Sequence, residues 1–578
     1  MIRLALLLLL VLAAAPAEAQ RSLAIKRFDA TIVVTPEGSV DVTESITAEF
    51  TGSWNGIFRT VPVEYRTPQG FNWTLRLDLL GVTGEKGQPL EVETSRERHY
   101  VKYRIRVPGA ENATRTVVIH YRAANGLRFL EDHDELYWNV TGDEWDVPVE
   151  AATANIILPE KATAVRAIAF NGVYGSTARD AVVETEGTTV RVTMPHRLDF
   201  HEGLTAVVGW DKGVVAPPTE AEQAAGFLWS NWPLAIPLLV FLAMFALWRR
   251  VGRDPKRLPV AVQYEPPASL TPAEAGTLMD YSADMRDITA TVVDLAVRGH
   301  LRIEEREESA LLGLFNRREY VFLRTDPPGS LPRVTERGGA RGLEPHEQQV
   351  LGGIFSGGST EVKLSDLENE FYRCLPGLRE AIFQRLIGRG LYRSRPDKVR
   401  SHWLLGALLL GVVLISVGVQ LGARLGLSPF PFVLAALVSG LIVVAFGRIM
   451  PARTVAGARA LERLLGFEEF LARVEKDRFE RVVKTPEMFE RYLPFAMAFG
   501  VERKWAKAFQ SIYREPPRWY VGSNSSAFDI GRLSSSLSDM SSRAQSAMTS
   551  SPRSSSSGSG FSGGSSGGGS GGGGGGGW

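Results

Sequence analysis

The sequence contains a single cysteine, Cys374, among its 578 residues, and its formal net charge is only +1. One cysteine cannot form a disulfide within the chain, so each folded part must be held by an apolar core of its own. Cys374 has no activating neighbour in the sequence beyond Arg373. We therefore expect a buried structural thiol there, not a reactive one.

Recognisable catalytic motifs are also missing. Outside the Ser/Gly-rich end of the chain there is no Walker loop, no G-x-G-x-x-G, no G-x-S-x-G and no H-E-x-x-H, and no paired cysteine ligands exist. His346-Glu347 lacks the second histidine that a zinc-binding helix needs four positions after the first. We expect a protein that is not an enzyme, without a cofactor, and we assign no catalytic, cofactor-binding or metal-ligating residue.

Long apolar runs are what the chain does have. Three of them reach the roughly 20 residues that cross a hydrocarbon core about 30 Å thick, and tryptophans flank the first. The last two are free of acidic residues, which disfavours the alternative of a buried soluble hairpin. We predict membrane-spanning helices at residues 228–248, 403–423 and 430–449.

A shorter apolar run lies at the N-terminus. It follows Arg3 and ends in the small-x-small pattern Ala17-Glu18-Ala19 ahead of Gln20. A charged start, a short apolar centre and this ending are typical of a secretory signal peptide. We interpret residues 1–19 as a signal peptide, with a retained N-terminal anchor as the alternative.

Basic residues indicate how the spans run. Lys and Arg cluster after the first span, before the second and after the third. Because positive flanks stay in the cytoplasm, residues 20–225 are predicted outside, and residues 249–402 and 450–578, with the C-terminus, inside. The outer region carries 21 basic and 29 acidic residues, a net of −8, against 24 and 22 in residues 249–402. We predict a multi-pass protein of the bacterial inner membrane with a periplasmic domain.

The exported region, residues 20–225, alternates apolar and polar side chains with a period of two, as from Val40 to Phe50. Alternation with one wet face is typical of antiparallel sheet. We predict an exported all-β, sandwich-like domain of one or two modules. Trp138 and Trp145 are expected in its core.

Candidate metal ligands in the exported region are few. The run from Glu131 to Glu135 places four acids around His133 and could ligate a divalent cation. A charged loop before a strand at residues 136–140 explains the run equally well. His196 and His201 lack a standard ligand spacing. Neither alternative for the acidic run is excluded by the sequence.

Residues 258–398 change to a helical pattern. A capped helix begins at Thr271, a second covers residues 287–298, and a strand from Leu301 can pair with residues 319–324. Helix, glycine, strand, loop, strand is how a winged helix ends. Further helices are predicted at 345–355, from 364 and at 376–387, and residues 294–301 resemble residues 385–392. We predict α-rich cytoplasmic domains with tandem winged-helix-like modules.

A winged helix suggests DNA binding, but the charge opposes it. Residues 249–402 carry 24 basic and 22 acidic residues, a net of +2, and the helix at 287–298 has two acids and one base. DNA-binding faces usually show a clustered excess of Lys and Arg. DNA is therefore disfavoured as a partner, and protein partners on the cytoplasmic side are favoured.

A further cytoplasmic helical region is predicted at residues 455–520. Within it, residues 459–476 form an amphipathic helix that packs on the other cytoplasmic helices or lies along the membrane surface. From residue 523 the chain is Ser-rich and then almost pure glycine. Because such a composition cannot bury a core, we predict a disordered tail over residues 523–578. Its last residue, Trp578, could dock in a pocket of a partner.

Several short blocks together resemble a known family. They are Gly56-Ile-Phe-Arg59, Leu136-Tyr-Trp-Asn-Val-Thr-Gly142, Tyr264-Glu-Pro-Pro267, Asp294-Leu-Ala-Val-Arg-Gly299 and Tyr492-Leu-Pro494. With the Ser/Gly tail they make the chain similar, over nearly its whole length, to the YciQ-like predicted membrane proteins, a bacterial family defined as a domain of unknown function. The resemblance implies the topology above and brings no activity.

Two functions of different classes follow. The favoured hypothesis is a non-enzymatic envelope interaction or scaffold/sensor protein that links an exported β domain, with an envelope ligand, to cytoplasmic protein-binding modules. The alternative is a membrane-tethered winged-helix DNA-binding regulator. A transporter is disfavoured because the three spans carry no acidic residue.

Overall fold

The computed structural model divides into two compact units. One comprises Met1–Leu239, Leu409–Gly440 and Phe561–Trp578, and we call it the β unit; the other, Val240–Leu408 with Leu441–Gly560, is the helical unit. The residues described are 21–267, 269–310, 315–325, 342–473, 485–513, 515–523, 528–550, 570–571 and 573–578. The predicted signal peptide, residues 1–19, lies outside these ranges.

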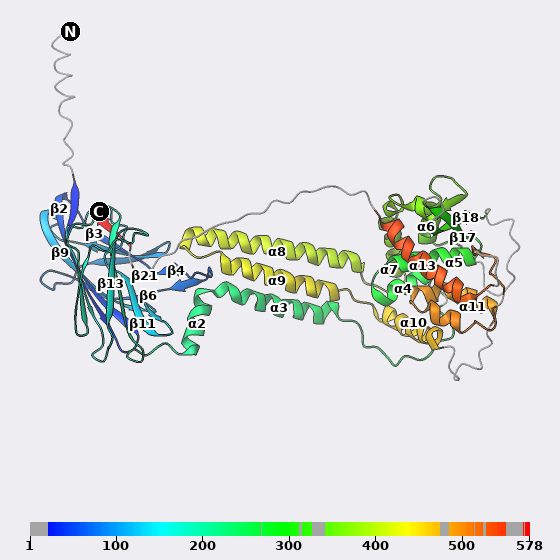
Figure 1. The fold of residues 1–578 in the computed structure, drawn as a ribbon, viewed down its shortest axis with the longest axis horizontal. Helices are drawn as coiled ribbons and strands as arrows, with labels where there is room; N and C mark the ends of the chain where they lie inside the picture. The colour runs from blue at the N-terminus through cyan, green and yellow to red at the C-terminus, as the bar shows by residue number, and fades with distance from the viewer. Residues whose placement is uncertain are drawn as a thin grey trace, which may run out of the picture. The chain divides into compact units, whose positions relative to one another are not determined.

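The β unit is built from several sheets (Figure 1). The largest has seven strands, in the order β14 (Val182–Glu186), β15 (Thr189–Thr193), β12 (Ala152–Ile157), β1 (Ser22–Val34), β2 (Ser39–Ser53), β9 (Glu111–Ala124) and β6 (Arg76–Gly84). A second sheet has the order β10 (Leu127–Phe129), β11 (His133–Asn139), β16 (Glu202–Asp211) and β13 (Arg166–Val173), with β21 (Ser570–Gly571) beside β11. A third has the order β22 (Gly575–Gly577), β3 (Gly56–Pro62), β8 (Tyr100–Arg106) and β7 (Val92–Glu97), and β4 (Glu64–Arg66) pairs with β5 (Asn72–Thr74).

One apolar core holds these sheets together. Along β2 every second side chain is buried, from Val40 to Phe50, as the alternation predicts. Trp138 and Trp145 are both buried in the core, which confirms their predicted place. The antiparallel prediction is wrong at one position, because β1 and β12 run parallel with Ile32 opposite Ile156. Between β1 and β12 the chain also forms strands of the second and third sheets. It then returns to the first sheet, where β12 lies beside β1 and runs in the same direction.

Three helices are long and apolar enough to cross a membrane: Trp232–Gly252, Pro396–Leu425 (α8) and Phe430–Ile449 (α9). The third agrees with its predicted bounds. The first begins at Trp232 and not at residue 228, because Asn231 ends a separate helix, α2 (Glu220–Ser230). The first span consists of a 3-10 turn at Trp232–Ala235, α3 (Ile236–Leu247) and a wide turn at Trp248–Gly252.

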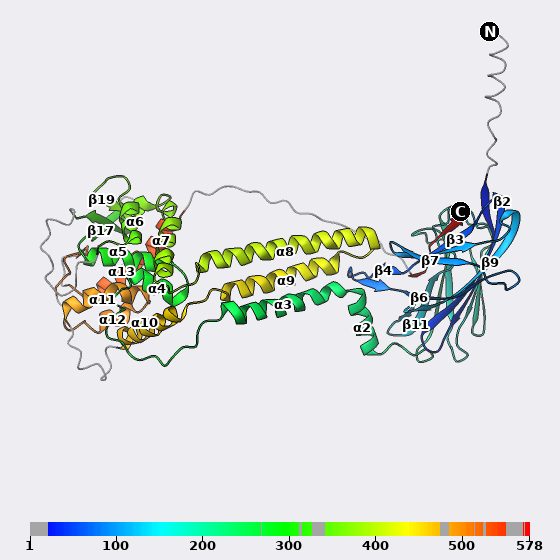
Figure 2. The ribbon, with the colours of Figure 1, turned by 180° about the vertical axis from the view of Figure 1, so that it is seen from behind.

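The spans lie side by side in both views (Figures 1 and 2). The ring of Trp232 in the first span meets that of Phe432 in α9 edge to face at 5.4 Å, and Phe241 meets Phe446 in the same way at 5.6 Å. The helices therefore pack through large aromatic side chains at these two levels.

The helical unit surrounds a second apolar core. Its helices are α4 (Pro272–Asp280), α5 (Met285–Val297), α6 (Pro345–Ile354), α7 (Leu375–Gly388), α10 (Val455–Arg473), α11 (Pro486–Ala498), α12 (Glu502–Lys507) and α13 (Ile530–Thr549). A small sheet has the order β19 (Glu361–Lys363), β18 (Phe315–Arg324), β17 (Leu301–Ala310) and β20 (Tyr520–Val521). Figure 2 shows α4, α5, α7 and α13 gathered in this unit.

Local sequence signals determine the first half of this unit. Thr271 caps α4 in a capping box with Glu274, as its Thr-Pro-Ala-Glu sequence predicts. The predicted strand from Leu301 pairs with Arg324 and its neighbours, which confirms the hairpin. The amphipathic helix after the third span, α10, packs its apolar side chains on the other helices of the unit.

The second winged-helix-like module is not observed. Leu364–Leu367 forms a single 3-10 turn, not a helix, and after α7 the described chain pairs only Tyr392 with Arg453 where a two-stranded wing was expected. The short block at residues 385–392 was therefore not sufficient evidence of a repeat. What this block has in common with residues 294–301 is a glycine at the end of a helix. Gly390, with a φ of 68°, has the conformation that ends many helices.

The predicted disorder of residues 523–578 is wrong for much of that range. α13 is a 20-residue helix that buries Leu533, Leu537, Met540 and other apolar side chains in the helical core. Their spacing of three and four residues is an amphipathic stripe hidden in a Ser-rich composition. The last residues form β22, against β3 of the β unit.

Candidate functional site

A polar junction joins the β4–β5 hairpin to the ends of the membrane-spanning helices. Its members are Asn72 at the start of β5, Asn231 directly before the first span, and Ser428 in the loop between α8 and α9, and we call it the β-side junction. All three residues are buried. A single residue of the hairpin thus touches segments that are 159 and 356 positions further along the chain.

Hydrogen bonds fix this junction on every side. The Asn231 amide accepts from the backbone N–H of Asn72 at 2.9 Å and donates to its carbonyl at 3.0 Å, as a neighbouring strand would. The Asn72 side chain accepts from the backbone N–H of Ser428 at 2.6 Å. The Ser428 hydroxyl donates to the Gly70 carbonyl at 2.6 Å. These buried groups therefore satisfy one another, and removal of one would leave its partner buried without a hydrogen bond.

Aromatic packing surrounds the hydrogen bonds. Phe71, next to Asn72, meets Phe227 of α2 and Phe430 of α9 edge to face, each with ring centroids 5.2 Å apart. A side chain at Gly70, whose φ is 90°, would press on the Phe430 ring. The tip of the hairpin therefore packs between α2, which precedes the first span, and the start of α9.

A second polar junction joins the other ends of the spans to α4, within the helical unit. It consists of Asp254 after the first span, Arg453 after the third, and Tyr281 and Tyr392, and we call it the helical-side junction. The Arg453 guanidinium donates to Asp254 at 2.8 Å and to the Leu278 and Met279 carbonyls at 2.7–3.0 Å. These carbonyls belong to the last turn of α4, where a cation is favourable.

The remaining contacts of this junction tie in the second span. Tyr392, shortly before α8, donates its hydroxyl to the Thr277 carbonyl at 2.9 Å, and its backbone forms a bridge with Arg453. The Tyr281 hydroxyl donates to Asp254 at 2.6 Å, and its ring lies 3.7 Å from the Arg453 guanidinium carbon. The chain segments next to all three spans therefore meet at one buried arginine.

The charge state of Asp254 follows from these contacts. Burial would raise the pKa of its carboxyl group. The Tyr281 hydroxyl, the Arg453 backbone N–H and the Arg453 charge outweigh that effect and hold the pKa below its ordinary value. Burial and the hydrogen bond to Asp254 raise the pKa of Tyr281. Asp254 is thus ionised, and Tyr281 neutral, over the neutral pH range.

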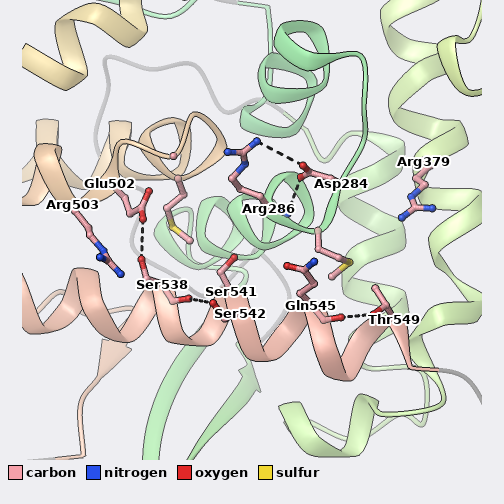
Figure 3. A pocket seen from close by; sticks show the side chains of 13 residues that line it. Asp284, Arg286, Arg379, Glu502, Arg503, Ser538, Ser541, Ser542, Gln545 and Thr549 are labelled. Atoms are coloured by element: carbon pink, nitrogen blue, oxygen red, sulfur yellow. Dashed lines mark hydrogen bonds and ion pairs between the residues drawn. The ribbon is translucent and has the colours of Figure 1, made fainter. Parts of the chain in front are cut away.

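The helical unit also contains a polar cavity of about 560 Å³, shown in Figure 3. Three guanidinium groups line it, those of Arg286, Arg379 and Arg503, together with hydroxyl groups of α13. Glu502 and Asp284 oppose them; Glu502 accepts from Ser538 at 2.9 Å, and Asp284 caps α5. An anionic group entering the cavity would meet an excess of one positive charge.

The sequence-based candidates for metal binding do not come together. His133 pairs with Asp132 at 2.7 Å, and the buried Asp134 faces Lys212 at 3.6 Å, so the acidic run is partly neutralised by its neighbours. His196 lies on the surface near Asp180, and His201 occupies a turn. In the ranges that the structure describes, no group of three or more His, Cys, Asp or Glu residues is placed to hold a metal ion.

Cys374 lies at the N-cap of α7 and is only partly buried, against the expectation of a buried thiol.

Both junctions were missed by sequence reasoning. Asn72 and Asn231 are ordinary polar residues in the sequence. The one local signal was the position of Asn231, a polar residue within the predicted span 228–248.

Known proteins match both halves of the chain. The N-terminal domain of a family described as "Predicted membrane protein (DUF2207)" matches residues 24–210, and the C-terminal domain of the same family matches residues 261–509. The chain belongs to this family. The "Uncharacterized protein YciQ" of Escherichia coli (strain K12) is 23% identical over 409 residues, covering 68% of this chain and 60% of that protein. The matched region is thus less than two thirds of the length of that family member.

Some solved structures align weakly with part of the chain. Yeast LTA4 hydrolase in complex with bestatin aligns with 34% of this chain and 31% of its own, at 10% identity and a TM-score of 0.23. An M1 zinc metallopeptidase from Deinococcus radiodurans aligns with 34% of this chain and 44% of its own, at 13% identity and a TM-score of 0.20. Scores this low carry no argument about the DUF2207 family's function.

Proposed function

We propose that this protein is a non-enzymatic scaffold or sensor of the bacterial inner membrane. Its β unit lies outside the cytoplasm and binds an envelope ligand, and its helical unit lies inside and holds protein partners. The observation that carries the proposal is the β-side junction, in which one residue, Asn72, contacts both the start of the first span and the α8–α9 loop. A displacement of the hairpin would be felt by all three helices.

The helical-side junction supports the same function. Arg453 brings together the segments that adjoin the three spans and the last turn of α4. A rigid helix transmits a small shift along its length, and each junction gives such a shift a defined point of entry or exit. The absence of recognisable catalytic motifs from the sequence supports a binding role over an enzymatic one.

The DNA-binding alternative is less well supported. The helix that would enter a major groove, α5, has buried side chains around its whole circumference, since the successive residues Ile288, Thr289 and Ala290, about 100° apart, are all buried. α11 and α13 pack against it. Since a recognition helix must present an exposed face to base edges, protein partners on the surface of the helical unit are the better proposal.

Coupling between the units is testable without knowledge of the ligand. In the full chain in lipid nanodiscs, Asn72→Ala removes the acceptor for the Ser428 N–H. We expect faster hydrogen exchange of the amides of α4, in the helical unit, as well as of the hairpin. Asn155→Ala on β12, which removes the acceptor of an exposed hydrogen bond from Arg191, is the matched control. Exchange in α4 that is unchanged by Asn72→Ala would contradict the proposed coupling.

The proposed topology has its own test. Glu186 is exposed on β14, and in spheroplasts a membrane-impermeant thiol reagent should label the Glu186→Cys variant in a Cys374→Ser background. The partly exposed Cys374 of the unmodified chain should react only after the membrane is opened. Labelling of Cys374 from outside would place the helical unit on the wrong side for this function.

A further inference from the structure

We propose that the edge of β3 is a receptor site for an exported polypeptide that carries a run of glycines followed by tryptophan. The residues Gly573–Trp578 of the chain itself show what fits this edge. β22 pairs antiparallel with β3, with Gly575 opposite Arg59 and Gly577 opposite Ile57. Addition of an extended segment to a sheet edge is a general mode of peptide recognition. The inference rests on the topology in the proposed function, with the β unit outside the membrane and the helical unit in the cytoplasm.

Backbone hydrogen bonds extend beyond the paired strand at both ends. At one end, the Thr60 N–H and hydroxyl both donate to the Gly574 carbonyl at 2.8 Å, and Glu144 donates to the Gly573 carbonyl at 3.0 Å. At the other end, Asn55 donates to the Trp578 carbonyl at 2.7 Å. The contacts run along the whole six-residue segment, so the site recognises an extended peptide and not a single side chain.

Close approach on both sides explains why the segment is glycine. A Cβ at Gly574 would overlap the Glu144 carbonyl oxygen, and one at Gly573 would overlap that of Thr60. Backbone atoms cannot move aside as side-chain ends can. A Cβ at Gly576 would instead touch only the Phe58 ring, at 3.0 Å, which can yield slightly. The edge therefore excludes side chains at some positions far more strictly than at others.

The tryptophan supplies the one side-chain contact. The guanidinium carbon of Arg104 on β8 lies 3.7 Å from the centroid of the Trp578 ring, a cation–π contact. Beside the ring is a cavity of about 240 Å³ lined by Phe58, Lys102, Arg104 and three residues of β7. An aromatic residue is thus selected at this position by an arginine on a neighbouring strand.

The receptor edge is held in place by a buried ion pair. Arg59, on β3, donates two hydrogen bonds to Glu44 of β2, at 2.8 and 2.9 Å, and both side chains are about 1% exposed. Tyr121 of β9 donates to the same carboxylate at 2.9 Å. Because this pairing does not involve Gly573–Trp578, β3 keeps its position for an incoming segment.

The proposed topology decides where the occupant comes from. If residues 450–550 lie in the cytoplasm, the chain's own Gly573–Trp578 can reach an exported β3 only by carrying Ser/Gly backbone through hydrocarbon. Unpaired N–H and C=O groups make that crossing prohibitive. The occupant in an intact membrane is therefore a segment of the same chemistry presented from outside.

The experiment uses the full chain ended after residue 569, in nanodiscs, and the labelled peptide Gly-Gly-Gly-Gly-Gly-Trp. We expect saturable binding. Alanine at the peptide position equivalent to Gly574 should weaken it about 100-fold or more, since the clash is with backbone. Alanine at the position of Gly576 should weaken it less than about 10-fold. Equal losses for the two peptides, or no saturable binding, would overturn the proposal.

Receptor variants separate this site from nonspecific adhesion. Arg104→Gln should weaken binding of the peptide about 3- to 10-fold through the lost cation–π contact, and Arg191→Gln, on the exposed face of β15, should leave it unchanged. The variant Arg104→Cys with Trp578→Cys, in a Cys374→Ser full chain, tests whether the chain's own Gly573–Trp578 is the occupant. A crosslink between them in spheroplasts would show that the protein's own segment fills the edge, and would overturn the assignment to an external polypeptide. Failure of peptide binding leaves the coupling measured at α4 unaffected, so the two proposals fail separately.

Discussion

The two junctions attach the same three helices to different folded units, and they do so with different chemistry. The β-side junction uses neutral amide and hydroxyl groups, on Asn72, Asn231 and Ser428. The helical-side junction uses an ion pair, Asp254 with Arg453, and the arginine also caps α4. Neutral groups cost less to bury than charges do, whereas one guanidinium can serve several acceptors at once.

Because one junction is neutral and the other contains an ion pair, the two junctions respond to different changes. A neutral network changes only when the hairpin or a helix moves, so the β-side junction is a mechanical contact. The helical-side junction also depends on the ionisation of Asp254. Burial raises the pKa of this carboxyl group, but Tyr281 and Arg453 lower it by more. Substitutions at the two junctions should therefore differ in size, in location and in dependence on pH.

The largest effect is expected for Arg453→Met. The change leaves the Asp254 carboxylate and the carbonyls of α4 without their main partner, and breaking a buried ion pair costs about 3–5 kcal/mol. The opening free energy of the α4 amides, measured by hydrogen exchange in nanodiscs, should fall by about this amount. Because coupling between two sites is reciprocal, the β4–β5 hairpin should also exchange faster, by a smaller factor than α4.

The matched control for that variant is Arg473→Met, which removes an exposed pair with Glu469 on α10. Exposed pairs within a helix contribute about 0.5 kcal/mol or less. A loss from Arg473→Met as large as that from Arg453→Met would show that the helical-side junction is not special.

A smaller effect is expected for Asn231→Ala at the β-side junction. The backbone N–H and C=O of Asn72 lose their partner, and leaving a buried polar group unsatisfied costs about 1–3 kcal/mol. Exchange at the β4–β5 hairpin reports this loss. If the hairpin keeps its protection, the amide of Asn231 does not hold it to the first span.

The smallest effect is a change in pH dependence with Asp254→Asn. Because the folded-state pKa of Asp254 is below its ordinary value of 3.8, the unmodified protein binds fewer protons than the unfolded chain at acidic pH. The contribution of ionised Asp254 to the free energy of unfolding is fully present above the unfolded-state pKa. It is lost as the pH falls through the lower, folded-state pKa.

We therefore expect the acid limb of α4 stability to be shallower in the Asp254→Asn variant, by less than about 1.4 kcal/mol per pH unit. The comparison is of slopes, since the variant also changes stability at neutral pH. Identical slopes would show that Asp254 does not titrate with folding. Strand β2, which takes part in neither junction, serves as the internal control in the same experiment.

Local patterns in the sequence were enough for the elements and their classes. Period-two alternation predicted β2 and its neighbours, apolar length predicted the three spans, and Thr271 marked the start of α4. These features depend on residues within one turn or one strand of each other. α13 shows the limit, since its apolar stripe is present in the sequence but lies among serines, which are weak helix formers.

The sequence by itself determined that the chain has an all-β region, three membrane-spanning helices and a second, helical region, because each follows from local periodicity or hydrophobic length. Only the tertiary structure decided that Asn72 meets Asn231, that Asp254 meets Arg453, and that glycines 573–577 fit the edge of β3. The partners in the two junctions are 159 and 199 positions apart. Such contacts depend on how distant segments pack, and no local pattern encodes them.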